Sequence, residues 1–291
     1  MNKSLTCLLL CAALTACESD YLGTAESQLV VEGWIENEGY PVVILSRSAP
    51  ISEDYTPMDE LDQYLLRWAK VTVSDGQNSV VLTGKYDSGY FPPYIYTTGR
   101  LKGRAGKSYT LTVEYRDYYA TATTTIPPTT VRPDFFVEKC ADSDTLYQVK
   151  VSFSDPPGEK NYYLLFARTG ADSKQYLASY LGSIDDTVLA DHTEYTVYRG
   201  RKLGAGTDYT PYFAEQDTVA VKLAQVDKAS YQFWDGFTKN LSLEGNLFLA
   251  PYTNVRTNVT GGTGYWCGMN SSTAYFIIPH PIPDRLPPEE P

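Results

Sequence analysis

The sequence has very little histidine. Of its 291 residues only two, His192 and His280, carry an imidazole. Two imidazoles leave few candidates for a zinc ligand or a catalytic base, so most metal-centred and histidine-dependent catalysis is not expected. The G-x-S-x-G and H-E-x-x-H patterns of hydrolases and zinc proteases do not occur either. We therefore expect no resident metal and no cofactor.

Positive charge is also scarce. The chain has 24 Lys and Arg against 35 Asp and Glu, a formal net charge of −11. A nucleic-acid backbone would meet like charge, so nucleic-acid binding is not expected. Hydrophobic residues make up 43% and charged residues 20%, which indicates packed domains rather than disorder. The 25 Tyr, 21 Gly and 18 Pro favour strands and turns over helices.

The N-terminus has the pattern of an export signal. A positive start is followed by the apolar stretch Ser4–Ala13, which is too short to span a bilayer. Leu14–Cys17 (LTAC) then resembles the lipobox of bacterial lipoproteins. This resemblance implies cleavage after residues 1–16 and acylation of Cys17, and three acyl chains would hold the protein firmly on a membrane. An ordinary secretory signal with an incidental cysteine is the alternative.

Acidic residues follow the predicted lipidation site. Glu18 and Asp20 are similar to the signal that sends Bacteroidota lipoproteins to the outer face of the outer membrane. We therefore expect a lipid-anchored outer-membrane protein exposed on the cell surface, with the periplasmic face as the alternative. After processing, two thiols remain, Cys140 and Cys267. Either a disulfide between them or two buried, inert thiols fits an exported chain.

Strand patterns and turn signals dominate the first half. Gln28–Ile35 and Pro41–Arg47 predict a hairpin, and Asp75-Gly76 between two alternating runs predicts another. Met58–Lys70 instead places apolar residues at helical spacing and predicts a short helix. Residues 17–27 would be a tether. The density of short strands predicts an immunoglobulin-like β-sandwich over residues 28–127.

A proline-rich stretch at residues 128–133 predicts a linker between two domains. Strand patterns resume after it and predict a second β-sandwich domain over residues 134–280. Asp227–Leu243 has a capping Asp and helical spacing, so one helix is expected near 228–243. Residues 281–291 are rich in Pro and predict a tail. The expected class is mainly β, with two sandwiches and one or two short helices.

Several short motifs occur in a fixed order: Val31–Ile35 (VEGWI), Ala69–Gly76 (AKVTVSDG), Gly106–Leu111 (GKSYTL), Asp155–Gly158 (DPPG), Asn161–Tyr163 (NYY), Tyr231–Trp234 (YQFW) and Asn258–Trp266 (NVTGGTGYW). Their order resembles the Bacteroidota lipoproteins grouped as domain of unknown function 4249 (DUF4249). The family has no assigned activity and no catalytic residues. Its members are typically encoded beside TonB-dependent outer-membrane receptors, so the resemblance implies a partner rather than a reaction.

Other residue patterns give little support for catalysis. The glycine run Gly261–Gly264 lacks the Lys-Ser/Thr of a phosphate loop and reads as a tight turn. Cys267 and His280 have no spacing typical of a nucleophile and its base. Five aspartates offer oxygen ligands for Ca²⁺ but follow no known calcium-binding spacing, and solvated loop acids are the better interpretation: Asp142, Asp144, Asp185, Asp186 and Asp191.

Aromatic clusters are the remaining candidates. Trp34, Trp68 and Trp234 lie in periodic apolar settings and are expected in the core. The run Tyr90–Tyr96 contains two prolines, which would hold its rings on a stiff loop as a contact surface. The alternative is that these rings cover one end of the sandwich. A second cluster follows Gly204 and Gly206, and there a packed loop is favoured. The candidate contacts are Tyr90, Phe91, Tyr94, Tyr96, Tyr209 and Tyr212.

The features together predict a binding or accessory subunit that works with a TonB-dependent receptor in nutrient uptake, and no enzymatic activity. A surface adhesin or assembly subunit of the same fold class is the second interpretation. A hydrolase with an unrecognised site is the third, since a pair of carboxylates among 35 acids has no signature in the sequence.

Overall fold

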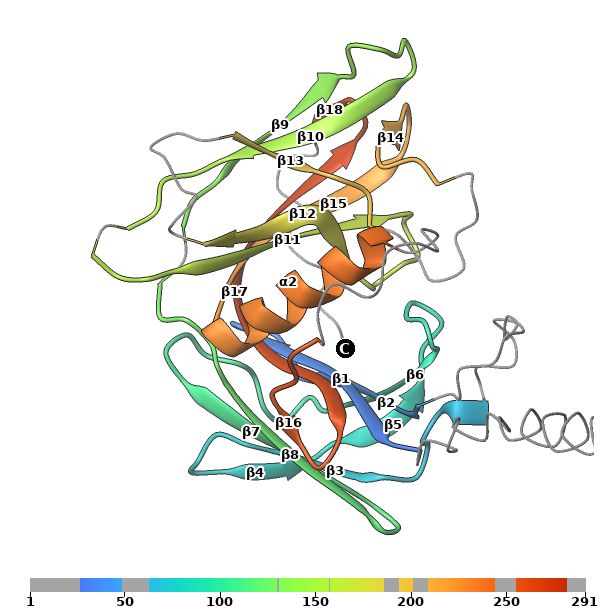
Figure 1. Cartoon of the computed structure of the whole chain (residues 1–291), viewed down its shortest axis with the longest axis vertical. Helices are drawn as coiled ribbons and strands as arrows, with labels where there is room; N and C mark the ends of the chain where they lie inside the picture. The colour runs from blue at the N-terminus through green and yellow to red at the C-terminus, as the bar shows by residue number, and fades with distance from the viewer. Residues whose placement is uncertain are drawn as a thin grey trace, which may run out of the picture.

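The chain is described by a computed structural model that covers residues 27–48, 63–129, 131–156, 158–185, 194–200, 209–243 and 255–281. Over these residues the fold is mainly β, with three sheets and one helix. Figure 1 shows the four-stranded sheet at the top, the five-stranded sheet at the bottom, and a long sheet with the helix between them. The prediction of a mainly β, sandwich-type fold is confirmed, whereas the immunoglobulin-like topology stays a prediction.

A nine-stranded sheet, here the long sheet, runs through both halves of the molecule. Its neighbours in order are β12 (Leu177–Asp185), β11 (Tyr162–Thr169), β15 (Thr218–Val226), β17 (Thr263–Ile277), β1 (Leu29–Glu36), β2 (Val42–Arg47), β6 (Tyr94–Thr97) and β5 (Thr83–Tyr86), and β18 (His280–Pro281) pairs with β17.

Two smaller sheets pack on the long sheet. The five-stranded sheet has the order β16 (Val259–Thr260), β8 (Tyr118–Thr125), β7 (Ser108–Tyr115), β3 (Lys70–Ser74) and β4 (Ser79–Val81). The four-stranded sheet has the order β13 (Glu194–Val197), β10 (Leu146–Ser152) and β14 (Phe213–Ala214), with β9 (Asp134–Lys139) also paired to β10. The five-stranded sheet and the part of the long sheet that it covers are called the first sandwich. The four-stranded sheet and the part of the long sheet that it covers are called the second sandwich.

The first and the last long strand of the chain join the two sandwiches. β1 pairs in parallel with β17 from Val30↔Thr263 to Glu36↔Met269. The close approach needs glycine: a Cβ on Gly264, whose φ is +104°, would lie 1.9 Å from the carbonyl oxygen of Val31. Further along, β17 pairs with β15. One strand therefore belongs to both sandwiches.

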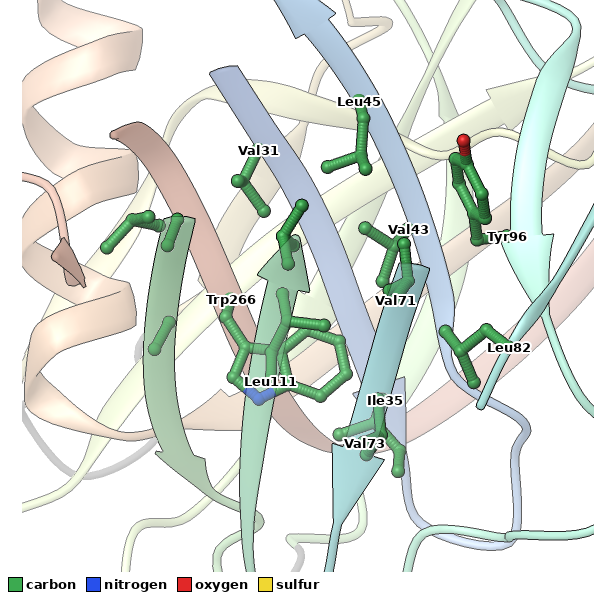
Figure 2. Close-up of a cluster of buried hydrophobic side chains, with 14 of the residues drawn as sticks. Val31, Ile35, Val43, Leu45, Val71, Val73, Leu82, Tyr96, Leu111 and Trp266 are labelled. Carbon is green, nitrogen blue, oxygen red and sulfur yellow. The ribbon is translucent and has the colours of Figure 1, made fainter. Parts of the chain in front are cut away.

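The core of the first sandwich lies between the long sheet and the five-stranded sheet (Figure 2). Alternate residues of β1, such as Val31 and Ile35, meet residues of β3 and β7. Trp266 of β17 fills the centre, and its ring nitrogen donates a hydrogen bond to the carbonyl oxygen of Tyr109 at 2.9 Å. Residues 28–127 supply all of this core except Trp266 and Val259.

The second sandwich has its own core. It lies between β11, β15 and β17 on one side and the four-stranded sheet on the other, with Tyr163, Phe213 and Phe276 fully buried in it. The expected linker at 128–133 falls between the two cores, and Val131 packs into the second one. The division of the chain into two domains stays a prediction. The long sheet contains strands from both sides of the linker.

The opposite face of the long sheet, here the outer face, is covered in part by the helix. α2 (Lys228–Leu243) is the helix expected near 228–243, and the Asp227 carboxylate caps it by accepting from the Ser230 amide at 2.8 Å. Phe233 and Trp234 of α2 pack on Tyr265, each with ring centroids 4.8 Å apart. The Asp227 carboxylate also accepts from the Thr124 hydroxyl of β8, so one residue ties α2 to the first sandwich.

The prediction of a helix over Met58–Lys70 is wrong for residues 63–70, the part of this range that the structure describes. Residues 63–64 form a single 3-10 turn, and Leu65 and Leu66 then run beside β2, where the Leu66 amide donates to the Leu45 carbonyl oxygen. Pairing with the sheet replaces the helical hydrogen bonds that the spacing predicted. Trp68 is consequently 87% exposed, not in the core. Residues 58–62, the signal peptide 1–16, the tether before Ser27 and the tail after Pro281 lie outside the described residues.

Candidate functional site

Polar residues gather on the outer face of the long sheet, beside α2. Residues of β1 alternate between the two faces, so Glu32, Trp34 and Glu36 point outward and stay half-buried. Tyr265 and Ser271 of β17 and Lys222 of β15 lie on the same face. We call Glu32, Glu36, Tyr176, Lys222, Tyr265 and Ser271 the seam cluster, because its members come from both sandwiches.

An ion pair forms the charged centre of the seam cluster. The Lys222 ammonium bonds to the Glu36 carboxylate, whose second oxygen accepts from the Ser271 hydroxyl at 2.8 Å. The Lys222 side chain is only 6% exposed and that of Glu36 is 24% exposed. Burial by itself would raise the pKa of Glu36, but the adjacent Lys222 and the Ser271 bond outweigh it and lower that pKa. The carboxylate is therefore held in its charged form.

An aromatic ring covers the ammonium group. The nitrogen of Lys222 lies 3.9 Å from the ring centroid of Tyr176, and the Arg168 guanidinium lies 5.1 Å from the same centroid. The quadrupole of the ring attracts both cations. Tyr176 precedes β12, so this contact attaches the β11–β12 connection to the outer face.

A second carboxylate lies further along β1. Glu32 accepts from the Tyr265 hydroxyl at 3.2 Å and also has a hydrogen bond with the Gln175 side chain. Burial raises the pKa of Glu32 to about 6, and these two hydrogen bonds offset only part of the rise. Burial and the nearby Glu32 also hold the pKa of Tyr265 well above its usual value, so its hydroxyl stays a donor.

The β5–β6 loop docks against the same connection. The Lys174 amide donates to the Gly89 carbonyl oxygen at 2.8 Å, and the Lys174 ammonium pairs with Asp87 at 3.1 Å. The Phe91 amide donates to the Gln175 side-chain oxygen at 3.0 Å. Since Gln175 also contacts Glu32, a continuous path of hydrogen bonds joins β1, the β11–β12 connection and this loop.

The aromatic run Tyr90–Tyr96 is only partly the exposed loop that was predicted. Tyr96 is 2% exposed, and its hydroxyl donates to the Leu66 carbonyl oxygen inside the first core. Tyr90 is also buried and packs near Trp34, with ring centroids 6.0 Å apart. Tyr94 and Tyr96 lie two positions apart in β6 and therefore on the same face of the strand, with ring centroids 5.6 Å apart, and Tyr94 packs at the edge of the same core. Phe91, at 36% exposure, is the one ring of the four candidates that is exposed.

The other aromatic candidates are packed or half-packed. The Tyr209 hydroxyl bonds to the Arg199 carbonyl oxygen, and Tyr212 lies 6.3 Å from Tyr198 between ring centroids. Both are half-buried beside the four-stranded sheet, as a packed loop would be. Of the tryptophans expected in the core, Trp234 is buried and Trp34 is half-buried between α2 and Tyr90.

The thiols and acids form no reactive group in the described part of the chain. Cys140 and Cys267 are both free thiols, and burial raises the pKa of Cys267 far above its usual value. His280 pairs with Ile277, and Ile277 lies ten positions after Cys267 in β17. The imidazole therefore does not lie beside the Cys267 thiol. Among the residues covered by the structure, no three His, Cys, Asp or Glu side chains gather to hold a metal ion. Asp186, Asp191 and the lipidation site Cys17 lie outside those residues.

Sequence reasoning missed the seam cluster. Its one local signal was Lys222, a lysine in the middle of the apolar strand Thr218–Val226. A lysine in such a strand is rarely buried without a partner, so it predicts a buried acid nearby. That acid, Glu36, lies on a strand 186 positions away, and no local pattern identifies it as the partner.

The comparison with protein families gives one match. The model described as Domain of unknown function (DUF4249) matches residues 17–274. The chain belongs to this family. In this DUF4249 chain the matched region includes the whole seam cluster and the β5–β6 loop. A search of the curated proteins found no match. Where the structure describes the DUF4249 chain, its single helix lacks the length and apolar character needed to cross a membrane.

Proposed function

We propose that this chain is an outer-membrane lipoprotein that serves as a binding or accessory subunit of a TonB-dependent receptor. The lipobox Leu14–Cys17 supports the anchor. The match to DUF4249, which begins at residue 17, supports the assignment to a lipoprotein family of the Bacteroidota. The receptor is the partner that this family resemblance implies, and nutrient uptake is the process.

The observation that carries the binding role is the position of Phe91. This exposed ring lies beside the seam cluster, where loops of both sandwiches are joined by Lys174 and Gln175. The loop is already held in place by hydrogen bonds, so a partner would find the ring in a fixed orientation and little ordering entropy would be lost on binding. Aromatic side chains in such settings are frequent anchors of protein interfaces.

The chemistry of the seam cluster favours binding over catalysis. Lys222 is paired and covered by Tyr176, and Cys267 is a protonated, buried thiol. A half-exposed carboxylate such as Glu36 offers acceptor oxygens to a polar ligand or partner.

The proposal is tested by purifying the tagged wild-type protein from detergent-extracted outer membranes of its native host and identifying the proteins that remain bound. We expect one TonB-dependent receptor in near-equal amount. A surface adhesin would instead retain matrix or host-surface components, and retention of no receptor would reject the partner. The Cys17→Ala variant tests the anchor separately, because it should leave the membrane fraction after a high-salt wash.

A further inference from the structure

The chain enters the first sandwich at one defined corner. The carbonyl oxygen of Ser27 accepts from the Tyr118 hydroxyl at 2.9 Å, and β1 then begins with Leu29 beside Arg47. Ten positions separate Ser27 from Cys17, a distance of at most about 35 Å even for a fully extended chain. A lipid on Cys17 would therefore keep this corner within that distance of the bilayer surface.

Two exposed aromatic rings lie at the same corner. Trp68 is 87% exposed and Tyr119 is 61% exposed. Trp68 lies two residues before Lys70, which pairs with Glu114 of β7, and Glu114 in turn pairs with Tyr119 of β8. Figure 1 shows the β7–β8 hairpin tip and the start of β1 at the lower right of the molecule. A tryptophan this exposed contributes little to the folded core, and its ring is accessible to a surface outside the chain.

Basic groups flank these rings. Arg47 and Arg116 are exposed at the corner, and Lys70 forms an exposed ion pair with Glu114 at 2.8 Å. Asp117 is the other exposed acid of the hairpin tip. The three basic groups thus outnumber the two acidic ones at this corner, although the whole chain has a net charge of −11. Tryptophan and tyrosine with nearby arginine is the combination found where proteins meet the headgroup region of a bilayer.

We propose that this corner, which we call the tether corner and define as Ser27, Arg47, Trp68, Arg116, Tyr118 and Tyr119, rests on the phospholipid headgroup region of the membrane. The inference rests on the proposed lipid anchor. The Trp68 ring enters the interface with its indole N–H toward water, and Arg47 and Arg116 face lipid phosphates, which suit the guanidinium group. The first sandwich thus lies against the membrane.

The short tether favours a bilayer as the occupant of this corner. A lipid-anchored domain meets its own membrane as an intramolecular event, so even weak interfacial contacts are populated. The contact also fixes which end of the molecule faces away from the membrane. The second sandwich would then be the end of the molecule far from the membrane.

The experiment uses the full lipidated protein in protein-free phosphatidylcholine vesicles whose acyl chains are brominated near the headgroup, which quenches nearby tryptophan fluorescence. We expect strong quenching of the wild type and its loss in Trp68→Phe, because Trp34, Trp234 and Trp266 are buried or half-buried. The matched control is Trp68→Phe combined with Tyr180→Trp. Tyr180 is 46% exposed on β12 of the second sandwich, so this variant should stay unquenched.

Equal quenching of the wild type and Trp68→Phe, or quenching of the Tyr180→Trp variant, would overturn the proposal. Flotation of the same vesicles separates this result from the anchor itself. Protein that floats without Trp68 quenching rejects only the tether corner, whereas protein that does not float rejects the lipid anchor.

Discussion

The ammonium group of Lys222 bonds to the carboxylate of Glu36, although 186 residues separate them in the chain. The pair joins β15 to β1 across β17, and Ser271 of β17 donates to the same carboxylate. A buried pair of this kind adds little to stability compared with apolar residues, but the loss of one partner leaves a charge uncompensated. Removal of either partner alone should therefore be costly, although the pair as a whole contributes little to net stability.

Replacing Lys222 should destabilise the protein strongly. We expect Lys222→Met to lower the free energy of unfolding by about 3 kcal/mol, the lower end of the range for a broken buried pair, because Glu36 keeps partial contact with water. Urea unfolding measures this loss. The control is Lys70→Met, which breaks the exposed pair with Glu114 and should cost less than about 1 kcal/mol. Equal losses in the two variants would contradict the role given to the buried pair.

The pKa of Glu32 predicts a component of stability that depends on pH. Its pKa is about 6 in the folded chain against 4.5 for the ordinary group, so the folded state binds the proton more tightly than the unfolded state. This contribution is fully present below pH 4.5 and is lost as the pH rises through 6, a change of about 2 kcal/mol.

The Glu32→Gln variant isolates this component. Carboxylates with a lowered pKa, such as Glu36, contribute stability that is largely present already above pH 4.5 and is lost at lower pH. The test is the difference between the variant and the wild type, because contributions that the two proteins share cancel in it. We expect the stability of Glu32→Gln relative to the wild type to increase from pH 4.5 to pH 6.5, as followed by urea unfolding at each pH. A constant difference across this range would show that Glu32 does not titrate there.

The hydroxyl of Tyr96 should matter for folding rather than for binding. It donates to the Leu66 carbonyl oxygen and accepts from the Ala69 amide at 3.0 Å, and burial raises its pKa to about 12. We expect Tyr96→Phe to cost about 1–3 kcal/mol of stability, because a buried carbonyl and an amide lose their partner. Tyr94→Phe, which removes a more exposed bond to the Arg67 carbonyl oxygen, is the control and should cost less. If the two variants lost the same stability, the burial of Tyr96 would not be the cause.

Local signals predicted much of the fold. Asp75-Gly76 marks the β3–β4 turn, with Gly76 at φ +85°, and Asp227 marks the start of α2. Both depend on residues within a few positions of one another. The expected strands Gln28–Ile35 and Pro41–Arg47 are β1 and β2 to within one residue at each end. These elements are set by short-range chemistry that a single sequence carries.

Sequence patterns alone did not predict which distant strands pair with one another. The parallel register of β1 with β17 joins residues more than 230 positions apart, and it determines both the shared sheet and the seam cluster. The helix expected over Met58–Lys70 failed for the same reason, because Leu65 and Leu66 pair with β2 instead of with their own neighbours. The prolines near Tyr90–Tyr96 predicted a stiff loop but gave no means to tell which rings would face the core.

The central claim is that the surface formed by Phe91 and the adjacent seam cluster binds a TonB-dependent receptor. The direct test is the amount of receptor retained by Phe91→Ala compared with Tyr180→Ala, an exposed aromatic of the second sandwich outside this surface. We predict that Phe91→Ala weakens the association by about 1–3 kcal/mol while its unfolding curve stays close to that of the wild type, and that Tyr180→Ala retains the receptor fully. Undiminished retention by a folded Phe91→Ala protein would contradict the account.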